Sequence, residues 1–352
     1  MIEIDGGDGG GGVLRTALGL SIGTGRAVRI GDVRGDRPDP GLKPQHVACI
    51  EAACAVSDGD ATGVEIGSDT VAFEPGPVDG GDVDVDVGTA GSATLVCSTV
   101  LPAALVADGV VRLRVSGGTD VAWSPPADYF GGVTLGALRA SGLATSLEIT
   151  RRGFYPAGGG TILLTAAPST LEPIALHERF PPSRVRVAAA ASDDLLDANV
   201  ADRLARTAGD RLSNAGLAVA SRSAEYVEAR STGAVVVIRV EVDRRSGTPV
   251  PIAGFSALGE PGVPAEDVAN AAVDDLRAWR DGSGAVDRHL ADQLVPILAL
   301  VGGRIRIPTV TDHVESAVAV ARRFGFDVAV EASESDGSTI VSADEPSTRL
   351  RR

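Results

Sequence analysis

Apolar and polar positions along the chain follow two periods, one typical of strands and one typical of helices. Residues 83–87 alternate between valine and aspartate, and residues 111–115 alternate between apolar residues and arginine. A period of two over a short run indicates a half-buried strand. The stretch between them, residues 91–106, is mostly small and apolar, as in a buried helix. Strands that alternate with helices predict an α/β fold.

One order of elements, strand–helix–strand–helix–strand–strand, recurs along the chain. The first copy is predicted from strands at 1–5, 26–32, 62–67 and 70–75 and helices at 12–23 and 43–57. The second has strands at 83–87, 111–115, 145–151 and 160–165 and helices at 91–106 and 128–142. A third, partial copy has helices at 286–301 and 312–324 and strands at 304–308, 326–331 and 338–342. We therefore expect three repeated βαβαββ units.

Residues 184–280 interrupt the third copy with an α/β pattern of their own. Strands are predicted at 185–190, 218–228 and 234–242, and helices at 196–215 and 264–280. The expected fold class is α/β (α+β), with a large domain of residues 1–183 plus 281–345 and a smaller α/β domain inserted at 184–280. Residues 346–352 are expected to be a disordered tail.

The composition is that of an ordered protein with an acidic surface. Hydrophobic residues make up 44% and charged residues 22%, and the formal net charge is −15. No apolar run reaches the roughly 18 residues of a membrane span, and the start of the chain lacks signal-peptide features, so we expect a cytoplasmic protein. Lys43 is the single lysine, and acidic, lysine-poor surfaces resemble those of salt-loving organisms. High salt screens the attraction to phosphates, so RNA contacts would depend on a few arginines and helix N-termini.

A glycine-rich segment, residues 7–12, lies between the first predicted strand and the first helix. It matches G-x-G-x-x-G with Asp32 about twenty residues on, which would indicate a dinucleotide site. However, residues 2–5 alternate, whereas the first strand of such a fold is apolar on both faces. A more general interpretation is a loop whose backbone N–H groups bind an anion, with Asp8 able to hold a divalent metal and Arg15 one turn into the helix. A sharp turn without a ligand is the third interpretation.

Several motifs, taken in order, resemble those of the RNA 3'-terminal phosphate cyclases. They are Asp5-Gly6 through Arg15, Arg37 through Leu42 with Gln45-His46, Ala90-Gly91-Ser92 with Thr99 through Pro102, Ser116 through Asp120, Pro125 through Tyr129, Arg152 through Gly160, and His289 through Gln293 ahead of His313. The resemblance covers nearly the whole chain. It implies three βαβαββ units with an insert in the third, in agreement with the element pattern.

The resemblance also implies an ATP-dependent reaction that closes an RNA 3'-phosphate into a 2',3'-cyclic phosphate, with AMP carried on His313. Thr311 or Asp312 would cap a helix, which places His313 in the first turn, where the positive helix end favours the neutral, nucleophilic imidazole. The chain departs from the usual family residues at four positions: Asp8 replaces Glu, Gly12 and Ser98 replace Gln, and His289 replaces Tyr.

The candidate site residues fall into four groups. The catalytic residue is His313; the nucleotide-binding residues are Ser98, Pro125, His289, Leu290, Ala291, Asp292 and Gln293; the RNA- or phosphate-binding residues are Arg15, Arg37 and Gln45; and the metal ligand is Asp8, for Mg²⁺ or Mn²⁺. His289 would stack on adenine with Pro125 on the other side. An ordinary polar helix face and solvated arginines are the alternatives to these roles.

The expected substrates are ATP and RNA with a 3'-terminal phosphate, and a homodimer is possible. Two other functions stay open from the sequence. One is a non-catalytic relative that binds RNA during ribosomal RNA processing, although such relatives lack the histidine nucleophile. The other is adenylylation of another nucleic-acid end, either DNA or a 5'-phosphate.

Overall fold

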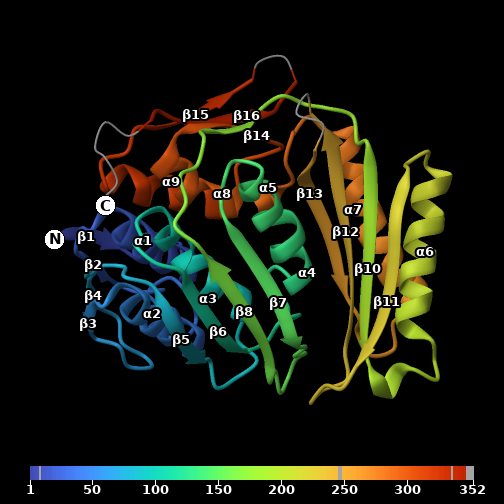
Figure 1. Cartoon of the computed structure of the whole chain (residues 1–352), viewed down its shortest axis with the longest axis horizontal. Helices are drawn as coiled ribbons and strands as arrows, with labels where there is room; N and C mark the ends of the chain where they lie inside the picture. Colours follow the sequence, from blue (N-terminus) through green and yellow to red (C-terminus); the bar gives the residue numbers. More distant parts are fainter. Residues whose placement is uncertain (8, 245–247, 334–335, 346–352) are drawn as a thin grey trace.

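The computed structural model describes residues 1–7, 9–244, 248–333 and 336–345. Within these residues the strands form four sheets of four strands each, and helices pack against them (Figure 1). The predicted α/β class is confirmed. Asp8 and the predicted tail at 346–352 lie outside the described residues. No helix in the described ranges is long and apolar enough to cross a membrane.

The first sheet comes from the N-terminal part of the chain. Its strands lie in the order β1 (Ile2–Asp5), β2 (Val28–Gly31), β4 (Val71–Glu74) and β3 (Asp60–Thr62). β1 and β2 are parallel, and the other pairs are antiparallel. Helices α1 (Gly11–Thr24) and α2 (Pro44–Ser57) follow β1 and β2. Residues of β1 are alternately buried and exposed, as the alternating sequence predicted.

Two further sheets share this strand order. The second consists of β5 (Gly81–Asp86), β6 (Val111–Gly117), β8 (Gly160–Ala166) and β7 (Thr145–Arg151). The third consists of β9 (Ile174–Leu176), β14 (Gly303–Ile307), β16 (Thr339–Ala343) and β15 (Val328–Ala332). In both, the first pair is parallel and the other pairs are antiparallel. The three repeated βαβαββ units expected from the sequence stay a prediction.

β9, the first strand of the third sheet, was not predicted from the sequence. β9 has three residues, too few for a period of two to be recognised. It pairs in parallel with β14, although residues 184–280 lie between the two strands in the chain. The third sheet therefore takes strands from both sides of the predicted insert.

The fourth sheet lies entirely within the interrupting segment. Its strands are β11 (Val219–Val227), β10 (Arg184–Ser192), β12 (Ala234–Asp243) and β13 (Pro249–Leu258). Helices α6 (Val200–Asn214) and α7 (Ala265–Asp281) pack together on this sheet (Figure 1). β13 was not predicted, because two prolines and a glycine obscure its pattern; an edge strand tolerates such residues. The domain limits proposed from the sequence stay a prediction.

The helix predicted at 128–142 is three short pieces instead. They are α4 (Ala127–Tyr129), a π-helical turn (Phe130–Thr134) and α5 (Leu135–Arg139). This segment packs against β12 and β13 of the fourth sheet, where a methyl group on Gly254 would lie 2.6 Å from the Tyr129 ring. A π-helical turn is often found at a functional site.

Helices α3, α8 and α9 complete the surroundings of α1. α3 (Ala93–Val100) continues as a 3₁₀ turn (Leu101–Leu105), and α8 (Arg288–Val301) and α9 (Asp312–Arg323) precede and follow β14 in the chain. All three contact α1. The close approach of α8 depends on Gly23, since a methyl group there would lie 2.8 Å from the Leu300 side chain. Elements from distant parts of the chain therefore meet around α1.

A candidate active site where two helices begin

A cavity of about 870 Å³ lies where α1, α3, α8 and α9 meet the loop before α4. The segment 256–271, from the end of β13 into α7, forms another part of its wall. The cavity is therefore lined by distant parts of the chain, including the segment that was predicted to be an insert. Its volume lies within the roughly 300–1,000 Å³ range of ligand pockets.

Most of the predicted site residues line this cavity. Those that do are Arg15, Ser98, Pro125, His289, Asp292, Gln293 and His313. Leu290 and Ala291 are instead buried in the protein core and do not line the cavity. Arg37 and Gln45 also lie outside the lining. The predicted metal ligand, Asp8, is outside the described residues.

Consecutive glycines let different side chains approach the first turn of α1. A methyl group on Gly10 would lie 3.3 Å from Arg37 Nε, and one on Gly12 would lie 3.5 Å from His313 Nδ1. Gly11 has no space for a methyl group, because His46 Nε2 occupies it. Gly10 also has a φ of 58°, a conformation that glycine adopts readily. The start of α1 is thus surrounded by imidazole and guanidinium groups, with Arg37 among them.

The first turn of α1 is open to an anion. No side chain caps it, and it contains no acidic residue. The first backbone N–H groups of a helix have no partner within the helix, and together with the helix dipole they attract phosphate. Arg15 lines the cavity from the same helix; burial lowers the pKa of Arg15, but an arginine remains charged.

His46 is neutral beside this turn. Burial, followed by the nearby charge of Arg15, lowers the pKa of His46 to about 3. Its Nδ1 accepts a hydrogen bond from the Lys43 backbone N–H at 3.0 Å, which places the remaining proton on Nε2, the atom facing Gly11. No sequence feature pointed to a functional role for His46. Its tautomer, fixed by the Lys43 contact, makes His46 a neutral donor at this turn.

His313 lies in the first turn of α9, which is held firmly. Thr311 caps the helix by accepting from Val314 N–H at 3.1 Å, and its hydroxyl donates to Asp292 Oδ1 at 2.5 Å. Asp292 therefore joins α8 to the start of α9. Burial raises the pKa of the Asp292 carboxyl.

Asp287 fixes the start of α8, and sequence analysis missed it. Its carboxylate accepts from the backbone N–H groups of His289 and Leu290, from Tyr129 Oη at 2.8 Å, and from Gly254 N–H at 2.8 Å. Burial raises the pKa of this carboxyl. One carboxylate thus connects α8, the segment 127–139 and β13, and it holds His289 at the cavity wall. Asp287 is the second residue of the helix predicted at 286–301, so its place at the start of that helix was the only available signal.

The amide groups of Gln293 and Gln45 make contacts within the protein. Gln293 Nε2 donates to the His289 carbonyl at 2.9 Å, and its Oε1 accepts from Thr134 Oγ1 at 2.8 Å. Gln45 Oε1 accepts from the Ser92 backbone N–H at 2.8 Å, which ties α2 to the start of α3. The Gln45 carbonyl oxygen therefore supports the fold near the site.

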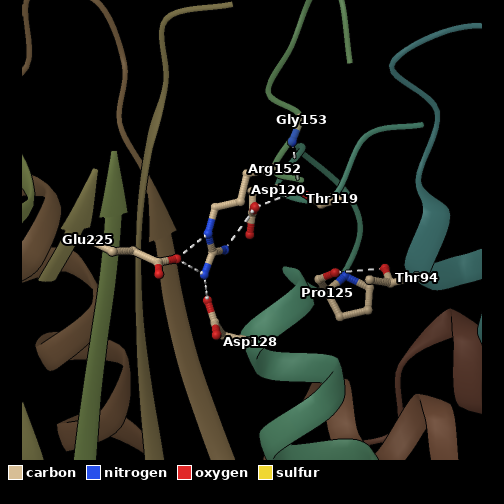
Figure 2. A network of polar contacts seen from close by, with 8 residues as sticks. All are labelled: Thr94, Thr119, Asp120, Pro125, Asp128, Arg152, Gly153 and Glu225. Carbon is tan, nitrogen blue, oxygen red and sulfur yellow. Dashed lines mark hydrogen bonds and ion pairs between the residues drawn. The ribbon is translucent and has the colours of Figure 1, made fainter. Parts of the chain in front are cut away.

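A buried ionic network centred on Arg152 supports the loop before α4 (Figure 2). The Arg152 guanidinium is 5% exposed and contacts Asp120 at 3.1 Å, Asp128 at 2.7 Å and Glu225 at 2.6 Å. Burial alone would lower the pKa of Arg152, but these three carboxylates raise it. Glu225 belongs to β11, so the network also ties the loop to the fourth sheet. In the same loop, the Pro125 carbonyl accepts from Thr94 Oγ1 at 2.8 Å.

Trp123 is a further cavity residue that sequence analysis missed. Its side chain is 100% exposed, and its backbone φ is 60°. The available signal was composition: aromatic residues make up 3% of the chain, and Trp123 is one of two tryptophans.

Within the described ranges, no group of three or more His, Cys, Asp or Glu residues could hold a metal ion. The described carboxylates at the cavity therefore do not form a complete metal site. The predicted Mg²⁺ or Mn²⁺ would depend on Asp8 together with oxygens of the bound phosphates, a donor set that suits either ion.

A large cavity lies at an uncapped helix start in this α/β fold, with arginines and histidines around that turn, a setting that suits an anionic ligand such as a phosphate. Comparison with known proteins identifies the family: the model for RNA 3'-terminal phosphate cyclase matches residues 6–331. The chain belongs to the RNA 3'-terminal phosphate cyclase family, whose members are ATP-dependent ligase-type enzymes.

Relatives named RNA 3'-terminal phosphate cyclase match along almost their whole lengths. The protein from Halobacterium salinarum is 40% identical, covering 97% of this chain and 100% of the relative. The protein from Archaeoglobus fulgidus is 43% identical, covering 92% and 95%, and that from Ectopseudomonas mendocina is 39% identical, covering 92% and 92%. Among solved structures, the enolpyruvyl transferase NikO from Streptomyces tendae has 13% identity and a TM-score of 0.40, covering 100% of this chain and 50% of NikO.

Proposed function

We propose that the protein converts an RNA 3'-terminal phosphate to a 2',3'-cyclic phosphate in three steps. First, an imidazole nitrogen of His313 attacks the α-phosphorus of ATP; an N–P bond forms, the α–β bridge breaks, and pyrophosphate leaves. Second, an oxygen of the RNA 3'-phosphate attacks this phosphorus, and AMP moves from histidine to RNA. Third, the ribose 2'-oxygen attacks the 3'-phosphorus, loses its proton, and expels AMP.

The observation that carries this proposal is that His313, at the start of α9, lies next to the uncapped start of α1. A nucleophile that attacks a phosphate needs that phosphate held beside it, and free backbone N–H groups supply such a binding site. A methyl group on Gly12 would lie 3.5 Å from His313 Nδ1, so the imidazole and the first turn of α1 are adjacent. Arg15, in the same cavity, supplies positive charge for the phosphates.

The nucleotide is proposed to lie between α8 and the loop before α4. His289 and Pro125 line the cavity from these two elements and are proposed to contact the two faces of adenine. Ser98, Asp292 and Gln293 line the surrounding wall. Arg37 is proposed to contact a phosphate at the Gly10 turn, to which its guanidinium is close. The role of Asp8 in binding Mg²⁺ or Mn²⁺, a cytoplasmic location and a homodimer stay predictions.

The test is self-adenylylation without RNA. Wild-type protein, His313→Ala and the control His177→Ala would be incubated with α-labelled ATP and Mg²⁺ or Mn²⁺, then separated by denaturing electrophoresis. We expect an acid-labile label on wild type and the control only, since His177 does not line the cavity. Label on His313→Ala would mean another nucleophile. No label on folded wild type would instead favour the non-catalytic RNA-binding function.

Adding an oligonucleotide tests the RNA steps. With a 3'-phosphorylated RNA, the labelled wild type should lose its label and produce a 2',3'-cyclic end. If AMP were transferred to DNA or to a 5'-phosphate and not to the RNA 3'-phosphate, the adenylylation chemistry of the proposal would stand, but its substrate would be wrong.

A further inference from the structure

The cavity contains a second region whose chemistry differs from that of the phosphate end. The inserted segment contributes Leu258, Glu260, Val263 and Asp267 to the wall, and Trp123 lines the same cavity from the loop before α4. These residues combine apolar surface with two exposed carboxylates. Arg15, Gly12 and His313, by contrast, come from α1 and α9.

Trp123 is the unusual residue of this region. A large apolar side chain that is 100% exposed loses the stabilisation that burial would give. A bulky residue with a φ of 60° is also strained, and such strain clusters at ligand-binding sites. The indole is therefore held open beside the cavity at a cost to stability. Val263, 42% exposed, is a second uncovered apolar residue of the same lining.

The charges of this region exclude one class of ligand group and admit another. Glu260 and Asp267 repel phosphates, so the triphosphate and the RNA phosphate are assigned to the Arg15 side. The other lining arginine, Arg288, donates to His289 Nε2 at 3.2 Å, on the proposed adenine side. A nucleobase is uncharged, stacks on aromatic rings and donates hydrogen bonds to carboxylates through its amino groups. The network around Arg152 fixes the loop on which Trp123 lies, through Asp120 and Asp128 on either side of it (Figure 2).

We propose that Trp123 and the inserted segment around Leu258 and Val263 form a subsite for the base of the 3'-terminal nucleotide of the RNA. This inference rests on the proposed function and deepens it. It also gives the predicted insert a role, because residues 256–271 supply part of the cavity wall. Stacking on an aromatic ring tolerates any base, so the subsite should require a base at the 3'-terminal nucleotide but discriminate only weakly between bases.

Steady-state kinetics with matched variants tests the subsite. The variants are Trp123→Ala, Trp123→Phe and the control Tyr155→Ala, whose side chain is 75% exposed but lies outside the cavity lining. We expect Trp123→Ala to raise KM for 3'-phosphorylated RNA roughly 5- to 100-fold, with Trp123→Phe much closer to wild type. The KM for ATP in self-adenylylation should be unchanged in the Trp123 variants. The KM for RNA should be unchanged in Tyr155→Ala.

An RNA with an abasic 3'-terminal nucleotide separates base stacking from other effects. This RNA should bind wild type as weakly as normal RNA binds Trp123→Ala. Combining the abasic RNA with Trp123→Ala should raise KM no further than either change alone. If removal of the base weakened RNA binding to Trp123→Ala as much as it weakens binding to wild type, that result would overturn the proposal. So would an unchanged KM for normal RNA, or a KM increase for ATP alone, which would assign Trp123 to adenine.

Fluorescence gives a readout that does not require catalysis. The other tryptophan, Trp279, is 8% exposed, so quenching by added RNA should come from Trp123 and disappear in Trp123→Phe. If wild type fails to adenylylate itself yet RNA quenches Trp123, the proposed function fails while the subsite stands. If adenylylation succeeds and a saturating concentration of 3'-phosphorylated RNA causes no quenching, the subsite fails.

Discussion

Helices α1 and α9 both begin at the cavity, but their first turns are built in opposite ways. α9 is capped by Thr311 and contains Asp312 and Glu315 in its first turn. α1 begins with glycines, has no side-chain cap and contains no acid in its first turn. A capped, acidic turn has little capacity for another anion, whereas an open turn attracts one. The difference supports the proposed division of roles, in which α9 positions the histidine and α1 binds the phosphate that it attacks.

The largest effect is expected from adding an acid to the open turn. Gly12→Asp should reduce self-adenylylation roughly 100- to 1,000-fold, because the carboxylate repels the phosphate. The same change should leave the fold intact or stabilise it by about 0.3–1 kcal/mol, since an acid suits a helix start. Labelling assays and urea unfolding of the same samples measure the two effects, which have opposite signs.

Gly12→Ala is the matched control for this substitution. Its methyl group would lie 3.5 Å from His313 Nδ1, an ordinary contact, and alanine adds helix propensity of about 0.5–1 kcal/mol. We expect activity close to wild type. If Gly12→Asp were as active as Gly12→Ala, the phosphate would have to bind elsewhere and the comparison of the two helix starts would fail.

A smaller effect is expected from weakening the capped turn. Thr311→Ala removes both the cap and the donor to Asp292, so it should cost about 0.5–2 kcal/mol of unfolding free energy. It should also lower kcat roughly tenfold by loosening His313, with little change in KM for ATP. Thr311→Ser, which keeps the hydroxyl, should restore both quantities. An equal kcat loss in Thr311→Ser would show that packing of the methyl group, and not the cap, positions the histidine.

Elements with a clear period were predictable from the sequence, and the missed ones have physical reasons. The aspartate–valine alternation of β5 and the apolar periodicity of α9 gave their positions closely. β9 is too short to show a period, and the prolines of β13 conceal one. The helix predicted at 128–142 was wrong as a single element, because a π-helical turn interrupts it where it meets the fourth sheet.

The candidate site also contains residues that could be predicted from the sequence and residues that could not. Ordered motifs led to Arg15, His289 and His313, which the fold brings to one cavity. The partners that fix these elements could not be found from one sequence, since Asp287 and Tyr129 are 158 positions apart and meet only in the folded chain. The contribution of residues 256–271 to the cavity wall likewise follows from three-dimensional packing.

The smallest effect concerns Asp292, the residue that joins the two helices at the capped side. Burial raises the pKa of its carboxyl above the usual value, so the folded protein holds this proton to higher pH than the unfolded chain does. The stability linked to Asp292 is therefore present at low pH and is lost as pH rises through the folded-state pKa. Asp292→Asn keeps an acceptor for Thr311 but cannot ionise. Urea unfolding between about pH 4 and pH 7 should show the variant gaining stability relative to wild type as pH rises. If the difference in unfolding free energy between Asp292→Asn and wild type stayed constant as pH rises, or changed in favour of wild type, the contact with Thr311 would outweigh burial.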